Sequence, residues 1–152
     1  MIAIPGLRDV CSHEAAPCNQ KMNTFRKEER LCSKKFIDLL FKNGSSFLLY
    51  PFRITYLPIH EQQPFPVKVV INVAKKRYKR AVDRNVIKRR TREAYRRQKA
   101  DFLYAPLQHA EKQLLLAVQF VGKEKYTYSF MEKKLQLALR KLIVLICPHE
   151  TP

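Results

Sequence analysis

The sequence predicts a single α+β domain in which helices and a four-stranded sheet form a two-layer sandwich. Three observations lead to this fold class. Segments with helical spacing of apolar residues and segments with strand-like composition follow one another in the order α-β-β-β-α-β-α. The length of 152 residues suits one domain. A content of 46% hydrophobic and 11% aromatic residues is typical of a chain that folds, although 28% of the residues are charged.

The first helix is expected at residues 33–42. Ser33 is a suitable N-cap residue, and Asn43-Gly44 follows the last apolar position. The apolar residues of this segment share one face of the helix: Phe36, Ile37, Leu40 and Phe41. The segment is therefore predicted to be a short amphipathic helix.

Three strands are expected next, because β-branched and aromatic residues are concentrated between Pro51, Pro58 and a Pro-containing loop at 60–66. The expected strands are residues 46–50, 52–57 and 67–73. Alternation divides the residues of two of these strands between opposite faces: Val67, Val69, Ile71 and Val73 against Lys68, Val70 and Asn72, and Phe52, Ile54 and Tyr56 against Arg53 and Thr55. One side of the sheet is thus expected to be more polar.

The second half of the chain predicts two longer helices and one buried strand. Residues 81–99 lack Gly and Pro and predict a helix, residues 114–120 are an apolar run, and residues 131–146 predict the last helix. The helix at 81–99 has a thin inner face: Ile87, Thr91, Ala94, Tyr95 and Gln98. The last helix has an apolar core face: Leu135, Leu139, Leu142, Ile143 and Ile146.

The domain is expected to span residues 22–147, between a loose N-terminal tail at 1–21 and a C-terminal tail at 148–152. Met22 opens the charged segment, which leads to the hypothesis that Met22 is the native start. No apolar segment approaches the roughly 20 residues that a bilayer-spanning helix needs, and the N-terminus lacks the features of a signal peptide. The four cysteines show no regular framework. We therefore expect a cytoplasmic protein.

The charge of the chain points to a polyanionic partner. Thirty Lys and Arg against 13 Asp and Glu give a formal net charge of +17. A field of that size attracts nucleic acid, with an anionic membrane surface as the weaker alternative.

Residues 75–99 hold 13 of the 30 basic residues, against only Asp83 and Glu93. On the predicted helix an arc of about 140° carries the polar residues that face away from the inner stripe: Arg84, Asn85, Lys88, Arg89, Arg92 and Arg96. Like charges at these spacings repel one another and suit bidentate contacts to phosphate. A merely solvated basic face is the alternative. Asn85 can contact a base, a sugar or a metal-bound water, or it can bond the backbone near the helix start.

The string from Ala81 to Ala94, AVDRNVIKRRTREA, closely resembles the Arg-Asn-x-x-Lys-Arg-x-x-Arg signature of the ribonuclease P protein subunit. Arg30-Leu31, Phe36, Phe41, Gly44 and the segment 67–76 follow in the order and approximate spacing of that family. The resemblance covers roughly residues 25–145 and leaves residues 1–21 outside.

The resemblance implies a mixed sheet with helices packed against one face, a fold like domain 2 of ribosomal protein S5, and the signature helix in a left-handed crossover between parallel strands. It implies a protein component of an endonuclease that removes the 5′ leader of precursor tRNA. In that family the RNA subunit and its Mg²⁺ ions are the catalyst, so no catalytic side chain, protein-bound metal or organic cofactor is expected. The implied partners are ribonuclease P RNA and precursor tRNA, without a membrane or a required protein partner.

The resemblance also assigns residues to two sites. The expected contacts to the RNA subunit are Arg84, Asn85, Lys88, Arg89 and Arg92, extended by Arg96, Lys75, Lys76 and Arg80. The expected lining of a leader-binding cleft between the first helix and the sheet is Phe36 or Ile37, Phe41, Arg53, Thr55 and Asn72. Plain core packing is the alternative for Phe36 and Phe41.

Two features depart from the family pattern. The loop before Ala81 is one residue longer, and Arg77-Tyr78-Lys79-Arg80 stands where a glycine is common. The aromatic residues of the first helix, Phe36 and Phe41, are five positions apart instead of four, so Ile37 is the alternative for the first position.

Other functions find less support in the sequence. Cys11, His13 and Cys18 lack a second pair of zinc ligands, and His60, His109 and His149 lack a nucleophile pattern. A basic ribosomal or other structural RNA-binding protein is the strongest rival, because it would share the charge and size. A DNA-binding repressor would need a helix-turn-helix or a dimer zipper, and neither is visible.

Overall fold

The computed structural model describes residues 24–148. The elements in chain order are the 3-10 turn η1 (Lys27–Glu29), α2 (Lys34–Asn43), β1 (Ser45–Leu49), β2 (Phe52–Ile59), β3 (Val67–Val73), α3 (Ala81–Lys99), the π-helical turn η2 (Ala100–Tyr104), α4 (Ala105–His109), β4 (Gln113–Phe120) and α5 (Tyr128–Ile146). The predicted tail at 1–21, the hypothesis about Met22 and the cysteine-histidine segment lie outside the described residues, as do residues 149–152.

The four strands form one mixed sheet in the order β1-β2-β4-β3. β2 pairs antiparallel with both β1 and β4, whereas β3 and β4 are parallel neighbours. Parallel neighbours need a crossover connection, and α3 lies in that connection. The α+β class and the mixed four-stranded sheet are therefore confirmed, and the basic helix forms part of the connection from β3 to β4.

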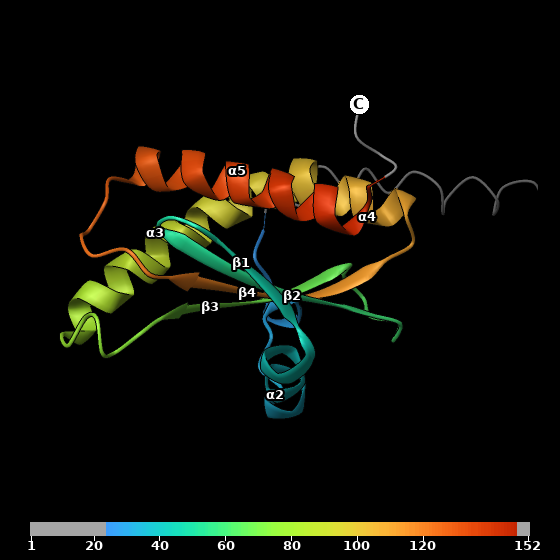
Figure 1. Cartoon of the computed structure of the whole chain (residues 1–152), viewed down its shortest axis with the longest axis horizontal. Coiled ribbons are helices and arrows are strands. Elements are labelled where there is room, and N and C mark those ends of the chain that lie inside the picture. Colours follow the sequence, from blue (N-terminus) through green and yellow to red (C-terminus); the bar gives the residue numbers. More distant parts are fainter. Residues whose placement is uncertain (1–23, 149–152) are drawn as a thin grey trace, which may run out of the picture.

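The sheet has a separate apolar cluster on each face. The larger cluster joins Phe52 and Ile54 of β2 and Leu116 and Val118 of β4 to the buried residues of α3 and α5. The smaller one joins Leu115 and Ala117 of β4 to Leu40 of α2. Figure 1 shows the result: α3 and α5 cover one face of the sheet, and α2 crosses the other as a partial third layer. Much of the sheet on the α2 side therefore stays uncovered.

The expected alternation along the strands is confirmed. Phe52 and Ile54 are fully buried on the α3 side, and Arg53 between them is exposed on the α2 side. β2 continues through Pro58, where the sequence predicted an end at Leu57. The extension is possible because β1 pairs with β2 only as far as Tyr56, so Pro58 meets no neighbour on that side. The short helical segment from Ala100 to His109 was not predicted.

Helix α2 matches the predicted bounds within one residue. The residues that flank it, Ser33 and Gly44, end the helix in ways that the sequence did not predict. Ser33 occupies the N-cap position without a side-chain cap hydrogen bond. Gly44 follows the helix in an extended conformation, with φ −73°. A Cβ atom at Gly44 would lie 2.2 Å from the carbonyl oxygen of Leu40 and 3.1 Å from that of Tyr56. Gly44 is thus required by the close approach of two backbones and not by a left-handed conformation.

Residues 24–31 lie along the free edge of β3 and against the end of α3. Arg30 forms an isolated parallel bridge with Val69, and the Leu31 N–H donates to the Val69 carbonyl over 2.9 Å. Glu29 is buried and forms an ion pair with Lys99, whose side chain is fully buried. The hydroxyl of Tyr104 also donates to the Glu29 carboxylate, over 2.9 Å. This buried polar group fixes the N-terminal segment to α3.

Candidate nucleic-acid interface

Helix α3 has the two faces that its sequence predicted. All five residues of the expected inner stripe are buried: Ile87, Thr91, Ala94, Tyr95 and Gln98. The Thr91 hydroxyl donates to the Ile87 carbonyl over 2.9 Å, and the Gln98 amide donates to the Glu132 carbonyl of α5 over 3.0 Å. The Thr91 hydroxyl and the Gln98 amide nitrogen therefore form hydrogen bonds within the fold, whereas the Tyr95 hydroxyl and the Gln98 Oε1 are buried without a partner among the described residues.

The outer face of α3 carries a groove between its own side chains. The groove is lined by Val82, Asn85, Val86, Lys88, Arg89 and Arg92. Asn85 and Arg89 are exposed, and Lys88 and Arg92 are partly exposed. Across the described chain no ion pair or side-chain hydrogen bond engages Asn85, Lys88 or Arg89. The groove thus presents two cations and an amide that are free to bind another molecule.

Arg84, the first arginine of the signature, is bound within the protein. Its Nη1 donates to the carbonyl oxygens of Tyr78 and Lys79, at 2.7 and 2.8 Å. Tyr78 is buried, and its hydroxyl donates to the Gly122 carbonyl over 3.0 Å. The hydrogen bonds of Tyr78 and Arg84 therefore fix the conformation of the loop at 74–80.

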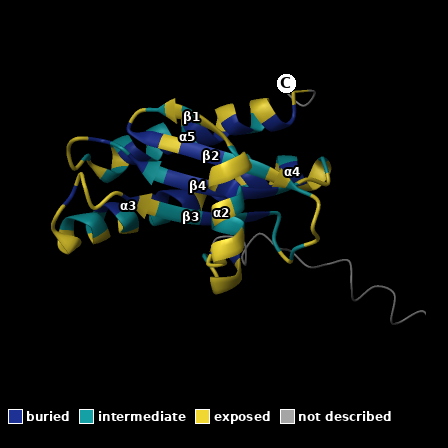
Figure 2. Cartoon of the chain, turned by 60° about the horizontal axis from the view of Figure 1, so that its bottom comes forward, coloured by how far each residue is buried: buried dark blue, intermediate teal, exposed yellow. Residues whose placement is uncertain are grey.

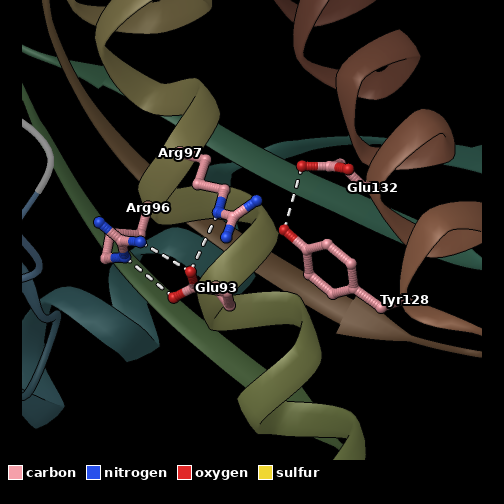
Figure 3. A network of polar contacts seen from close by, with 5 residues as sticks. All are labelled: Glu93, Arg96, Arg97, Tyr128 and Glu132. Carbon is pink, nitrogen blue, oxygen red and sulfur yellow. Dashed lines mark hydrogen bonds and ion pairs between the residues drawn. The ribbon is translucent and has the colours of Figure 1, made fainter.

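Arg96 is also paired within the protein, although it belongs to the predicted contact set. Its guanidinium forms a two-point contact with Glu93, with Nε at 2.9 Å and Nη2 at 2.6 Å from the carboxylate oxygens. Arg97 adds a third bond at 3.1 Å (Figure 3). These bonds, those from Arg96 above all, lower the pKa of the Glu93 carboxyl to about 2. Part of the donor capacity of Arg96 is thus already used.

Arg92 lies where α3 meets the N-terminal segment. Its guanidinium is 6.0 Å from the centre of the Phe25 ring, and the guanidinium of Arg30 is 5.3 Å from the same ring. Nε of Arg92 is buried without a hydrogen-bond partner among the described residues. The Phe25 ring therefore forms cation–π contacts with both arginines, and with Lys99, whose Nζ is 5.8 Å from the ring centre. Sequence reasoning did not place Phe25 and Arg30 at this surface, because they are far from α3 along the chain.

The loop residues in the predicted set, Lys75, Lys76 and Arg80, are all exposed. Lys75 and Lys76 lie in the turn after β3, and Arg80 is the N-cap residue of α3. They extend the cationic surface from the groove of α3 toward the ends of β3 and β4.

The predicted cleft residues of the sheet lie together on the face that α2 crosses. Arg53 is opposite Gln119 of β4, and Asn72 of β3 is opposite the same residue. These three side chains form a polar row across the sheet. Thr55 lies in the next row, opposite Ala117, and is buried. Gln119 was missed by sequence reasoning, although the alternation of β4 places it on this face.

The two aromatic residues predicted for the cleft, Phe36 and Phe41, lie on different flanks of helix α2. Leu40 is fully buried, and Phe36 lies on one flank of it, where the Lys68 Nζ is 5.9 Å from its ring centre. Phe41 is 47% exposed, and helical geometry places it about 140° around the axis from Phe36 but only about 40° from Ile37. Ile37 and Phe41 therefore share a flank, and Phe36 lies on the other.

The residues from 24 to 148 contain no group of three or more His, Cys, Asp or Glu side chains that could hold a metal ion. No helix in that range is long and apolar enough to cross a membrane. Both described cysteines, Cys32 and Cys147, are free.

An α+β domain with an arginine-lined helix on one face of its sheet, and a polar row and the helix α2 with its aromatic residues on the other, has the arrangement expected of a small polyanion-binding protein. Residues 25–143 match the family model described as Ribonuclease P. A ribonuclease P protein component from Porphyromonas gingivalis is 34% identical over 116 residues, which cover 76% of this chain and 84% of that protein. The chain belongs to the ribonuclease P protein family.

Solved structures agree with the fold. The RNase P protein from Thermotoga maritima superposes with a TM-score of 0.59 at 24% identity, covering 74% of this chain and 96% of that one. The Staphylococcus aureus RNase P protein has a TM-score of 0.59 at 22% identity, covering 76% of this chain and 96% of that one.

Proposed function

We propose that this chain is the protein component of a ribonuclease P, which binds a catalytic RNA subunit and the 5′ leader of precursor tRNA. The observation that carries the proposal is the groove of α3: the signature residues Asn85, Lys88 and Arg89 line it without internal partners among the described residues. Guanidinium and ammonium groups on one helical face bind phosphates, and an amide among them can bind a base or a sugar.

In this proposal the RNA subunit lies along the outer face of α3. Arg89 and Lys88 contact its phosphates, and Arg92 and Arg30, held by the Phe25 ring, continue the contact toward β3. Arg84 acts mainly by fixing the loop that carries Lys79 and Arg80 beside the helix. The exposed lysines at 75 and 76 extend the same surface.

The leader lies on the opposite side of the sheet, in the cleft between α2 and the polar row. Phe41 and Ile37 provide a stacking and apolar surface, and Arg53, Asn72 and Gln119 provide hydrogen bonds and one charge. Stacking on aromatic rings tolerates varied base sequence, which a binder of many different leaders requires.

The chemistry in this proposal belongs to the RNA subunit and its Mg²⁺ ions. The face of α3 offers cations, which bind phosphate oxygens and not Mg²⁺, so the metal would be held mainly by the RNA and the substrate. The protein contributes positioning and positive charge, and both reduce the repulsion between two polyanions in one complex. The reaction is the endonucleolytic removal of the leader, in the cytoplasm.

The decisive experiment adds the purified protein to a bacterial ribonuclease P RNA at low Mg²⁺ and measures cleavage of precursor tRNA. We expect strong stimulation, because bound cationic side chains replace part of the Mg²⁺ that the RNA needs to hold its substrate. A protein that binds the RNA without stimulating cleavage would instead be a structural RNA-binding protein, and the proposal would be wrong.

A further inference from the structure

A basic pocket lies at the end of the sheet where three connections meet: the β1–β2 turn, the loop after β3 and the loop after β4. It is lined by Ser46, Phe47, Leu48, Tyr50, Arg53, Arg77, Val121 and Lys123. Only Arg53 belongs to the predicted leader-binding cleft. The other two cations, Arg77 of the loop after β3 and Lys123 of the loop after β4, were not among the residues that the sequence predicted to bind RNA.

The three cations of this pocket are all exposed. In the described part of the chain no ion pair or side-chain hydrogen bond links Arg53, Arg77 or Lys123 to a carboxylate. Glu124, the one carboxylate that acts electrostatically on Tyr50 among the described residues, forms no salt bridge with any of the three cations. Three cations that line one pocket without a salt bridge suit the binding of an anion, and a phosphate group fits their chemistry.

The pocket also has a rigid aromatic surface. Tyr50 is 44% exposed, and its ring meets that of Tyr126 edge to face, with centres 6.0 Å apart. The two hydroxyl groups are hydrogen-bonded over 2.7 Å, and the Lys123 N–H donates to the Tyr50 hydroxyl over 3.2 Å. Leu48 beside it is 61% exposed. A fixed ring next to an exposed apolar side chain suits the face of a nucleobase.

Buried contacts hold the loops that supply Arg77 and Lys123. Tyr78, next to Arg77, is anchored through its bond to the Gly122 carbonyl. A Cβ atom at Gly122 would lie 2.6 Å from the Phe120 ring and 2.9 Å from the Tyr126 ring, so only glycine fits between these aromatic side chains. The two loops therefore meet in one fixed arrangement, and the cations approach each other without a large ordering cost on binding.

The pocket continues the leader-binding cleft. Leu48 is opposite Arg53, which is opposite Gln119, which is opposite Asn72. Leu48 and Arg53 of this row line the pocket, so the row joins the pocket to Gln119 and Asn72 of the polar row. We propose that the pocket binds an additional nucleotide of the single-stranded leader, with its phosphate at Arg77 and Lys123 and its base against Tyr50 and Leu48. The proposal rests on the proposed function and extends its leader-binding site.

The test compares precursor tRNAs whose leaders range from one to about sixteen nucleotides, which brackets typical single-strand site sizes. The holoenzyme is reconstituted with wild-type protein, with the double variant R77A/K123A, or with K133A. Lys133 is an exposed lysine of α5 and serves as the matched control. The dissociation constant of each precursor tRNA is measured at several salt concentrations.

We expect R77A/K123A to bind short-leader substrates like the wild type and long-leader substrates at least about fivefold more weakly. With the long leaders, the salt dependence should fall by about 0.7 in slope for each lost phosphate contact. K133A should match the wild type at every length. Because Arg77 and Lys123 are exposed, both variants should fold normally.

A second pair of variants tests the base contact. Y50A should weaken binding of long-leader substrates and leave binding of short-leader substrates unchanged. Y50F keeps the ring and should bind long-leader substrates more tightly than Y50A, close to the wild type. An equal loss at all leader lengths would mean that the pocket contacts the RNA subunit or the tRNA body, and no loss would mean that it contacts no RNA; either result overturns the inference. Failure of the proposed function looks different, because the wild-type protein would then not stimulate cleavage at all.

Discussion

Three arginines of α3 show how one residue type takes different roles on a single helix. Arg84 bonds two loop carbonyls, Arg96 is paired with Glu93, and Arg89 has no partner among the described residues. All three lie within one arc of the helix. Their different roles follow from the groups that lie near each side chain. Arg84 meets loop carbonyl oxygens near the N-terminus of α3, Arg96 meets a carboxylate about one turn away, and Arg89 meets neither.

Glu93 shows how the pairing of one side chain affects stability. Because its pKa is lowered in the folded protein to about 2, from an ordinary value of 4.5, its contribution to stability is present above pH 4.5 and is lost as the pH falls toward 2. The side chains of Glu93 and Arg96 are 40% and 33% exposed, so solvent weakens the pair.

We therefore expect Glu93→Gln to lower the free energy of unfolding by about 0.2–1 kcal/mol at neutral pH. Urea unfolding from pH 7 to about 2 should show the difference between the variant and the wild type shrink as Glu93 becomes protonated. High salt should shrink it too, because the pair is partly exposed. A difference that did not change with pH would show that the carboxylate charge is not its cause.

Among the elements of the fold, the N-terminal segment is joined to α3 by a buried ion pair. Glu29 and Lys99 have almost no exposed side-chain surface, and Tyr104 donates to the same carboxylate. Burial lowers the pKa of the Lys99 ammonium, and the hydrogen bond with Glu29 opposes that shift. This group places Phe25 against Tyr95 and beside Arg92, so it also positions part of the proposed RNA-binding surface.

A double-mutant cycle tests this connection. Glu29→Gln and Lys99→Met should each lower the free energy of unfolding by roughly 3–5 kcal/mol, because each disrupts the buried ion pair. The double variant should lose clearly less than the sum, since no unpaired charge remains and the amide introduced at position 29 can still accept a hydrogen bond from Tyr104. Additive losses in urea unfolding would show that the two side chains do not interact.

Across the whole molecule, the sheet keeps two proposed RNA surfaces apart. α3 lies on one face, and α2 crosses the other (Figures 1 and 2). Figure 2 shows most of α2 exposed on this face, and β4 is buried along most of its length. A catalytic RNA and its substrate could thus contact the protein at the same time without competing for the same side chains.

This separation predicts that substitutions on the two surfaces act independently. Arg89→Ala should weaken binding of the RNA subunit and flatten its salt dependence by roughly one unit of slope, if Arg89 contacts a phosphate. Arg53→Ala should weaken binding of precursor tRNA to the holoenzyme. In the double variant each of these two binding losses should equal that of the corresponding single variant within about 0.5 kcal/mol, because the sites share no partner. Strong coupling in the measured dissociation constants would show that one RNA spans both surfaces.

The order of the elements, the alternation of the strands and the inner stripe of α3 could all be predicted from the amino-acid sequence. These features depend on local periodicity, so each element can be predicted from the residues of its own segment. The basic arc of α3 was predictable for the same reason, and the family followed from the string around Arg84 to Arg92, which the match over residues 25–143 confirms.

Which side chains remain free to bind depends instead on contacts between distant segments. The partners of Lys99 and Tyr78 lie 70 and 44 positions away in the sequence, where no periodic pattern connects them. The same is true of the pocket at the sheet end, which draws its cations from one strand and two loops. Helical spacing places an arginine on a face, but long-range packing decides whether it meets a carbonyl, a carboxylate or open solvent.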